Sequence, residues 1–218
     1  MGSPVSVPLV QVVDAFVAEV REIESIFSQY RGHRTVLGVG YTYVPLEDGC
    51  LVSLWDAWSR FLRRLVLTSA AGTTIGLSGT AYVPPVARSE GQALGDLTSN
   101  RRGNNFGIIN GEPKWFGAVQ LPNIVSFLGI PNRNVIIGAI SASSVTLGPI
   151  SVANPLDEIR VCRNFIAHKA PPTLLDIQRY TIGPYTDLSA HLRQLRSGVE
   201  AFSEWCECLE ALAGAACQ

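Results

Sequence analysis

Apolar residues recur at steps of three and four positions along three long stretches of the sequence, 9–27, 50–70 and 187–213. This spacing places them on one face of an α-helix, which has to be buried against other elements. Gly198 is a weak point in the last stretch because glycine is a poor helix former. The apolar positions of the first stretch are Leu9, Val13, Phe16, Val20, Ile23 and Phe27.

A fourth, shorter helix is predicted to begin near Pro155. Proline is favoured in the first turn of a helix, and Asp157 and Glu158 suit the positive end of the helix dipole. The sequence "APP" at 170–172 should end this helix. Four helices with this spacing predict an all-α fold, an antiparallel helical bundle.

The region from about 72 to 120 interrupts the helical pattern. Gly, Asn, Pro and Ser are dense in it, and its periodicity is weak, so we expect an irregular insertion. A loop of this length in a compact domain is usually functional or disordered. Short helices are expected at 121–128 and 134–142, although the second could equally be a strand. With 218 residues, we expect one domain, 1–218, that carries this insertion.

The composition limits the classes of function. Apolar residues make up 47% of the chain and charged residues 16%, which excludes global disorder and predicts a large core. The net charge of -1 lacks the footprint of a general nucleic-acid binder, so contact with a nucleic acid would need a local basic patch.

The cysteines and the uncharged segments predict the compartment. Five cysteines, an odd number with irregular spacing, are interpreted as reduced thiols of a cytoplasmic protein. The N-terminus shows no secretory signal pattern. The uncharged run 135–153 contains serines, glycines and a proline that disfavour a membrane-spanning helix, so we expect a soluble protein without membrane contact.

Common catalytic signatures are absent from the sequence. It contains no P-loop, no dinucleotide-binding glycine motif, no HExxH and no GxSxG. With only His33, His168 and His191 available, a histidine-rich metal centre is implausible, and we expect neither a metal nor a cofactor.

The decapeptide "RVCRNFIAHK" at 160–169 concentrates polar groups on one side of the predicted helix. At about 100° per residue, Arg160, Arg163, Asn164, Ala167 and His168 fall within an arc of roughly 140°. The small Ala167 would leave room for a ligand. A structural explanation is also open: Arg160 could pair with Asp157 or a glutamate, and His168 could favour the negative end of the helix.

The hexapeptide "RNFIAH", Arg163 to His168, resembles the R-x4-6-H motif of HEPN-domain proteins. The order of long helices, insertion, motif helix and closing helix is similar to that family as well. The resemblance implies a HEPN-like bundle, metal-independent endoribonuclease activity, and a homodimer in which the motifs of two protomers form a composite site. It further implies a role as a toxin or antiviral-defence effector.

The resemblance implies a role for each motif residue. His168 would move protons to or from the ribose 2′-hydroxyl or the leaving oxygen, Arg163 would hold the scissile phosphate, and Asn164 would orient the imidazole or the partner protomer's motif. Arg160 and Lys169 are candidates for further phosphate contacts. Arg101 and Arg102, in the insertion, either contact RNA or are ordinary polar residues of a loop.

Two points leave other functions open. Some members of the family carry, two positions after the histidine, a tyrosine that an antitoxin modifies, and here that position is Ala170. An antitoxin or defence partner protein therefore stays possible, but not through that modification. The alternative function is a non-catalytic HEPN-fold module that binds RNA or protein, as an antitoxin or sensor subunit.

Overall fold

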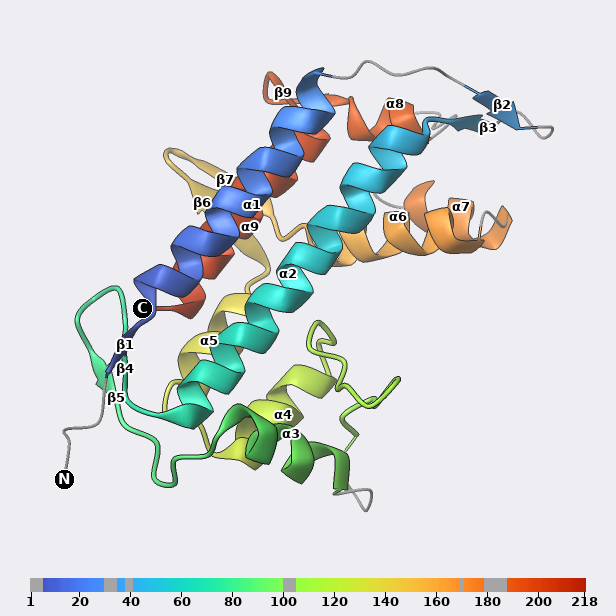
Figure 1. The fold of residues 1–218 in the computed structure, drawn as a ribbon. Coiled ribbons are helices and arrows are strands. Elements are labelled where there is room, and N and C mark those ends of the chain that lie inside the picture. The colour runs from blue at the N-terminus through green and yellow to red at the C-terminus, as the bar shows by residue number, and fades with distance from the viewer. Residues whose placement is uncertain (1–5, 30–34, 38–40, 100–104, 169–170, 179–187) are drawn as a thin grey trace. The chain divides into compact units, whose positions relative to one another are not determined.

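The computed structural model describes residues 6–29, 35–37, 41–99, 105–168, 171–178 and 188–218. The described part is mostly helical, and it also contains several small sheets, so the expectation of a purely all-α fold is only partly right (Figure 1). The helices are α1 (Val10–Gln29), α2 (Pro45–Ala71), α3 (Glu90–Ser99), α4 (Gln120–Leu128), α5 (Arg133–Ile140), α6 (Leu156–His168), α7 (Pro171–Gln178), α8 (Leu188–Leu192) and α9 (Ala201–Ala216). The strands are β1 (Val7–Pro8), β2 (Thr35–Leu37), β3 (Tyr41–Tyr43), β4 (Thr74–Ile75), β5 (Ala81–Tyr82), β6 (Ser144–Leu147), β7 (Ile150–Ala153), β8 (Leu195–Arg196) and β9 (Val199–Glu200).

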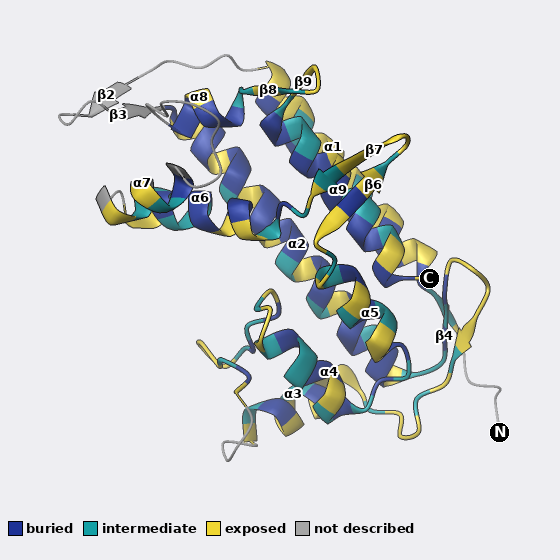
Figure 2. Ribbon diagram, turned by 180° about the vertical axis from the view of Figure 1, so that it is seen from behind, coloured by how far each residue is buried: buried dark blue, intermediate teal, exposed yellow. Residues whose placement is uncertain are grey.

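The chain forms two compact units. The first unit consists of Met1–Val17, Trp58–Ala142 and Ala211–Gln218, and the second of Ala18–Ala57 and Ser143–Glu210. The long helices α1, α2 and α9 each contribute residues to both units. Their predicted amphipathic character is visible in Figure 2, where buried and exposed residues alternate along them.

The core of the first unit is aromatic where α1 and α2 meet. The rings of Phe16 and Phe61 have centroids 4.8 Å apart, and Trp58 lies 5.7 Å from Phe16. Such ring pairs add stabilisation beyond the area that they bury. A three-stranded sheet completes this unit, with β1 parallel to β4 and β4 antiparallel to β5.

The predicted insertion, 72–120, belongs to the first unit and is more regular than expected. It contains β4, β5 and α3, whereas 105–119 has only an isolated bridge between Ile109 and Glu112. This irregular part is fixed by Glu112, which accepts hydrogen bonds from Arg63 at 3.2 Å and from the Trp115 indole at 3.0 Å. The two short helices expected after the insertion are present as α4 and α5, and the second is a helix rather than a strand.

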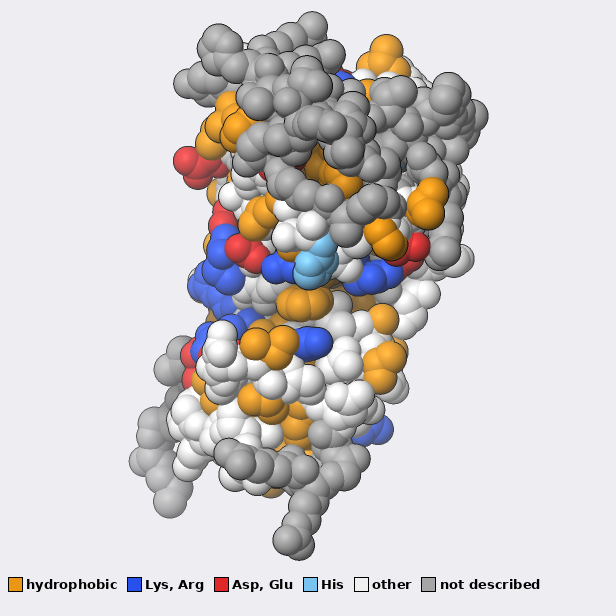
Figure 3. All heavy atoms as spheres, turned by 90° about the vertical axis from the view of Figure 1, so that its right-hand side faces the viewer, with side chains coloured by type: hydrophobic (Ala, Val, Ile, Leu, Met, Phe, Trp, Pro, Cys, Tyr) orange, Lys and Arg blue, Asp and Glu red, His pale blue; other side chains and the backbone are white. Residues whose placement is uncertain are grey.

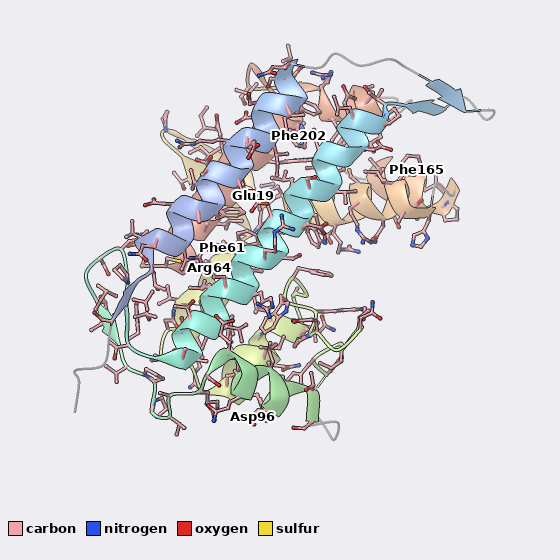
Figure 4. The ribbon with its side chains drawn as sticks, in the orientation of Figure 1. Glu19, Phe61, Arg64, Asp96, Phe165 and Phe202 are labelled. Atoms are coloured by element: carbon pink, nitrogen blue, oxygen red, sulfur yellow. The ribbon has the colours of Figure 1, made fainter. Side chains whose placement is uncertain are left out.

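Helices α1 and α9 pack antiparallel in the second unit. The rings of Phe27 and Phe202 stack with centroids 4.1 Å apart, and Arg21 forms an ion pair with Glu210 at 3.2 Å. Phe27, near the end of α1, contacts the start of α9, whereas Arg21, earlier in α1, contacts a later part of α9. The two helices therefore run antiparallel. Figure 4 labels Phe202 on α9 beside α1.

The last predicted helix, 187–213, is wrong in its first half. It is divided into α8 and α9 by the hairpin β8–β9, in which Leu195 pairs with Glu200 and Arg196 with Val199. Ser197 and Gly198 link the strands, both with positive φ (54° and 91°). Positive φ at both central residues is the requirement of a type I′ turn, the connection that best matches the twist of a hairpin.

The remaining expectations concern cysteines and membrane contact. All five cysteines are buried free thiols. The uncharged run 135–153 forms the end of α5 and the hairpin β6–β7. Within the described ranges, no helix is long and apolar enough to cross a membrane.

We predict that Gly198→Ala destabilises the protein by about 1–2 kcal/mol, because an L side chain in the left-handed region is strained. Gly214→Ala in α9 is the matched control: a Cβ there meets nothing within 4 Å, and the change should stabilise by about 0.5–1 kcal/mol. Urea unfolding of both variants measures the difference. Equal effects at the two glycines would contradict the turn geometry.

Candidate functional site

The helix that carries the RNFIAH motif begins where the sequence predicted. The Asn154 side-chain oxygen accepts a hydrogen bond from the Leu156 backbone N–H at 3.0 Å, which satisfies one of the free donors at the start of α6. Asp157 and Glu158 lie in its first turn, near the positive end of the helix dipole. The helix is described as far as His168, and α7 begins at Pro171.

Helix α6 has a buried face and a solvent-accessible face. The buried face includes Cys162 and Phe165, and Figure 4 shows Phe165 on this helix. Arg160, Ala167 and His168 are exposed, and the intervening Arg163 and Asn164 are partly exposed. These exposures agree with the polar arc predicted from the helical wheel. Figure 3 shows an exposed histidine side chain on the face that it draws.

The polar residues of the accessible face differ in their partners. The Arg160 guanidinium donates to the Asp157 carboxylate, with Nε 2.9 Å from Oδ1, so the structural explanation considered for Arg160 applies. Within the described residues, the side chains of Arg163, Asn164 and His168 form no hydrogen bond or ion pair. The donors of Arg163 and the ring nitrogens of His168 are therefore accessible to a ligand, and Asn164 does not orient His168 within the chain.

The structure does not describe the other predicted site residues. Lys169, Arg101 and Arg102 lie outside the described residues, as does Ala170. The basic residues of α2 belong to the first unit, where Arg63 is paired with Glu112.

The sequence did not single out Glu158, the residue with the densest set of polar contacts on α6. Only 7% of Glu158 is exposed. Its carboxylate accepts from Arg196 through two hydrogen bonds, of 2.6 and 2.9 Å, and from the Trp205 indole N–H at 3.1 Å. His191 Nε2 lies 2.9 Å from the same carboxylate. A bidentate contact with arginine is one of the strong hydrogen-bonding arrangements of a carboxylate.

These contacts decide the ionisation of Glu158. Burial on its own would raise the pKa of the carboxyl group, but the hydrogen bonds and charges of Arg196 and His191 outweigh burial and lower the pKa to about 2. The pKa of Arg196 is raised in turn, since its burial is outweighed by the hydrogen bond and charge of Glu158 and by Glu204. Glu158 is therefore a carboxylate at neutral pH.

A second arginine of the same segment forms a comparable network. Arg193 Nε donates to Glu47 at 2.6 Å, and its Nη1 donates to Glu200 at 3.1 Å. Its Nη2 donates to the backbone oxygen of Phe27 at 3.1 Å, which satisfies a carbonyl at the end of α1. The guanidinium also lies over the Phe27 ring, 4.4 Å from its centroid, a favourable cation–π contact.

A cavity of about 450 Å³ lies beside Glu158 in the second unit. It is lined by Val152, Ala153, Glu158, Gln194, Leu195, Arg196, Ser197, Glu204 and Trp205. None of the motif residues Arg163, Asn164 and His168 lines it. In the part of the chain that the structure describes, no group of three or more His, Cys, Asp or Glu side chains is placed to hold a metal ion.

Comparisons with models of known protein families, with curated proteins and with solved structures gave no match. The site is therefore interpreted from its own geometry and from the motif.

A signal for Glu158 did exist in the sequence: it lies four and seven positions before the apolar Cys162 and Phe165, on their face of the helix. A carboxylate on an apolar face requires a buried partner.

We predict that Glu158 stabilises the fold by about 3 kcal/mol near neutral pH, from a pKa of about 2 in the folded chain against 4.5 as the ordinary value. Because the folded pKa is lowered, this contribution is present above about pH 4.5 and is lost as the pH falls toward about 2. The difference in free energy of unfolding between the parent and Glu158→Gln should therefore shrink from about pH 7 to about pH 3.

Urea unfolding at the two pH values measures this difference. Glu207→Gln is the control, because Glu207 is an exposed carboxylate on α9 and its removal should change stability little at either pH. A gap between the parent and Glu158→Gln that is the same at both pH values would contradict the assignment.

Proposed function

We propose that this protein is a metal-independent endoribonuclease of HEPN type, with Arg163 and His168 as its catalytic residues. The observation that carries the proposal is the position of these two residues. Both lie on the accessible face of α6, and within the described residues neither side chain has a polar partner. An arginine and a histidine that have no polar partner in the described part of the chain, on a helix whose opposite face is buried, are available to a phosphodiester. The RNFIAH motif supplies the reaction class.

The chemistry follows from the two side chains. The imidazole of His168 accepts the proton of the ribose 2′-hydroxyl, and the 2′-oxygen attacks the adjacent phosphorus. The bond from phosphorus to the 5′-oxygen breaks, and this oxygen takes a proton from an acid, either an imidazolium or water. The products carry a 2′,3′-cyclic phosphate and a 5′-hydroxyl. DNA resists because it lacks the nucleophile.

Arg163 stabilises the charge that develops on the phosphate. Its planar guanidinium can donate to two oxygens at once. Asn164 makes no polar contact within the described residues, so we assign it to the RNA or to the motif of a second protomer. Arg160 contributes less to phosphate binding than Arg163, because Asp157 already neutralises part of its charge.

A homodimer would complete the site. The proposed residues are on an accessible helix face and do not line the cavity described beside Glu158, so a single chain offers them as a surface. A second copy placed across a two-fold axis would enclose that surface and supply another Arg163 and His168. The proposed role as a toxin or antiviral-defence effector, with or without a partner protein, is an analogy with the family that the motif resembles.

We predict that the protein cleaves a mixed RNA pool in the presence of EDTA and leaves cyclic phosphate ends. His168→Ala and Arg163→Ala should each lower the rate by roughly a hundredfold or more, since they remove a proton carrier and a phosphate donor. Arg21→Ala is the control, because Arg21 is an exposed arginine of the second unit, which also contains α6. Product ends are identified by mass spectrometry.

Two outcomes would contradict the proposed nuclease activity of this site. If the parent leaves RNA intact but binds it, and His168→Ala binds equally well, the protein is a binding module. If cleavage persists in His168→Ala, the activity does not come from this site.

A further inference from the structure

We infer that Glu158 is a positioning residue for the proposed site: together with Arg196, His191 and Trp205 it fixes the rotation of α6 about its axis, and with it the face that carries Arg163 and His168. This inference rests on the proposed function for its link to activity. We call the contacts of Glu158 with Arg196, His191 and Trp205 the clamp. Its effect on α6 can be measured without RNA.

The carboxylate of Glu158 is held on both oxygens. Oε1 lies 2.6 Å from Arg196 Nη2 and 2.9 Å from His191 Nε2. Oε2 lies 2.9 Å from Arg196 Nη1 and 3.1 Å from the Trp205 indole nitrogen. Three hydrogen bonds, two from Arg196 and one from Trp205, occupy most of the about four acceptor sites of a carboxylate. Both oxygens of Glu158 are therefore engaged within the protein, which assigns the residue to positioning and not to catalysis.

The partners come from three different elements. Arg196 is on β8, His191 on α8 and Trp205 on α9, so the carboxylate is fixed relative to the hairpin and to two helices of the second unit. A rotation of α6 by one position, about 100°, would withdraw the carboxylate from all of them. Breaking a buried ion pair leaves an uncompensated charge, so such a rotation is strongly disfavoured.

The clamp determines which side of α6 carries the motif, because Glu158 and the motif residues lie on the same helix. In an ideal helix Arg163 lies about 140° around the axis from Glu158, and His168 about 80°. With Glu158 held inward, Cys162 and Phe165 are buried, and Arg163 and His168 face solvent. Loss of the clamp would allow α6 to rotate or fray at the end that bears His168.

Glu47 offers a matched control in the same unit. It is also a buried carboxylate, 2% exposed, and it is bound to an arginine, with Oε1 2.6 Å from Arg193 Nε. Glu47 lies on α2, however, and the hydrogen bonds of Arg193 described above go to α2, α1 and β9. Glu47→Gln and Glu158→Gln therefore make the same chemical change in similar surroundings, but only the second acts on the motif helix.

The experiment compares these variants with the parent by hydrogen–deuterium exchange and by RNA cleavage in EDTA. In Glu158→Gln we expect amide exchange in α6 to be roughly tenfold faster or more, and exchange in α6 of Glu47→Gln to match the parent. For cleavage, Glu158→Gln should lower kcat by roughly tenfold to a hundredfold with little change in KM, because the catalytic groups are misplaced and RNA still binds. Glu47→Gln should keep the kcat of the parent.

Several outcomes would overturn the inference. One is unchanged exchange of α6 in Glu158→Gln. Another is an equal loss of kcat in both variants, which would indicate general destabilisation. If the parent does not cleave RNA, the proposed function fails, and the exchange data alone decide for or against the clamp. If Glu158→Gln does not fold, Arg196→Lys, which keeps the charge but loses the two-pronged contact, takes its place with the same expected results.

Discussion

The ion pair between the buried Glu158 and the partly exposed Arg196 is the interaction on which the arrangement of the second unit depends. It joins residues that are 38 positions apart in the chain. Burying two charges is costly, and the attraction between them repays the cost only if geometry and further hydrogen bonds are good. Here the two hydrogen bonds from Arg196 and the one from Trp205 meet that condition, and His191 Nε2 lies 2.9 Å from the same carboxylate.

The hairpin between α8 and α9 makes this pairing possible. It places Arg196 on Glu158, while Arg193, just before it, reaches Glu47 and the end of α1. The reversal depends on Ser197 and Gly198, whose positive φ angles a continuous helix could not accommodate. A short interruption of a helical pattern therefore brings two arginines to carboxylates on two different helices.

Much of the helical framework was predictable from the sequence. The amphipathic spacing predicted α1 and α2 within a few residues, because burial of an apolar face is a strong and local constraint. Proline and acidic residues at its start predicted where α6 begins. The prediction of one helix over 187–213 was wrong, since the pattern of apolar residues continues through Ser197 and Gly198 while the backbone turns there. The insertion was predicted as irregular, but it contains the helix α3 and two short strands. The strands were missed because backbone pairing over two residues needs no periodic signal.

The sequence by itself determined which residues share the accessible face of α6, because the angle between side chains on a helix is fixed by its geometry. It also supplied the motif from which the proposed chemistry follows. The pairing of Arg160 with Asp157, three positions away on the same helix, was open from the sequence. Only the tertiary structure decided that Arg163 and His168 have no polar partner among the described residues, and that Glu158 is buried among donors. The physical reason is that helical periodicity is a property of neighbouring residues, whereas the partner of a buried charge is chosen by how distant segments pack.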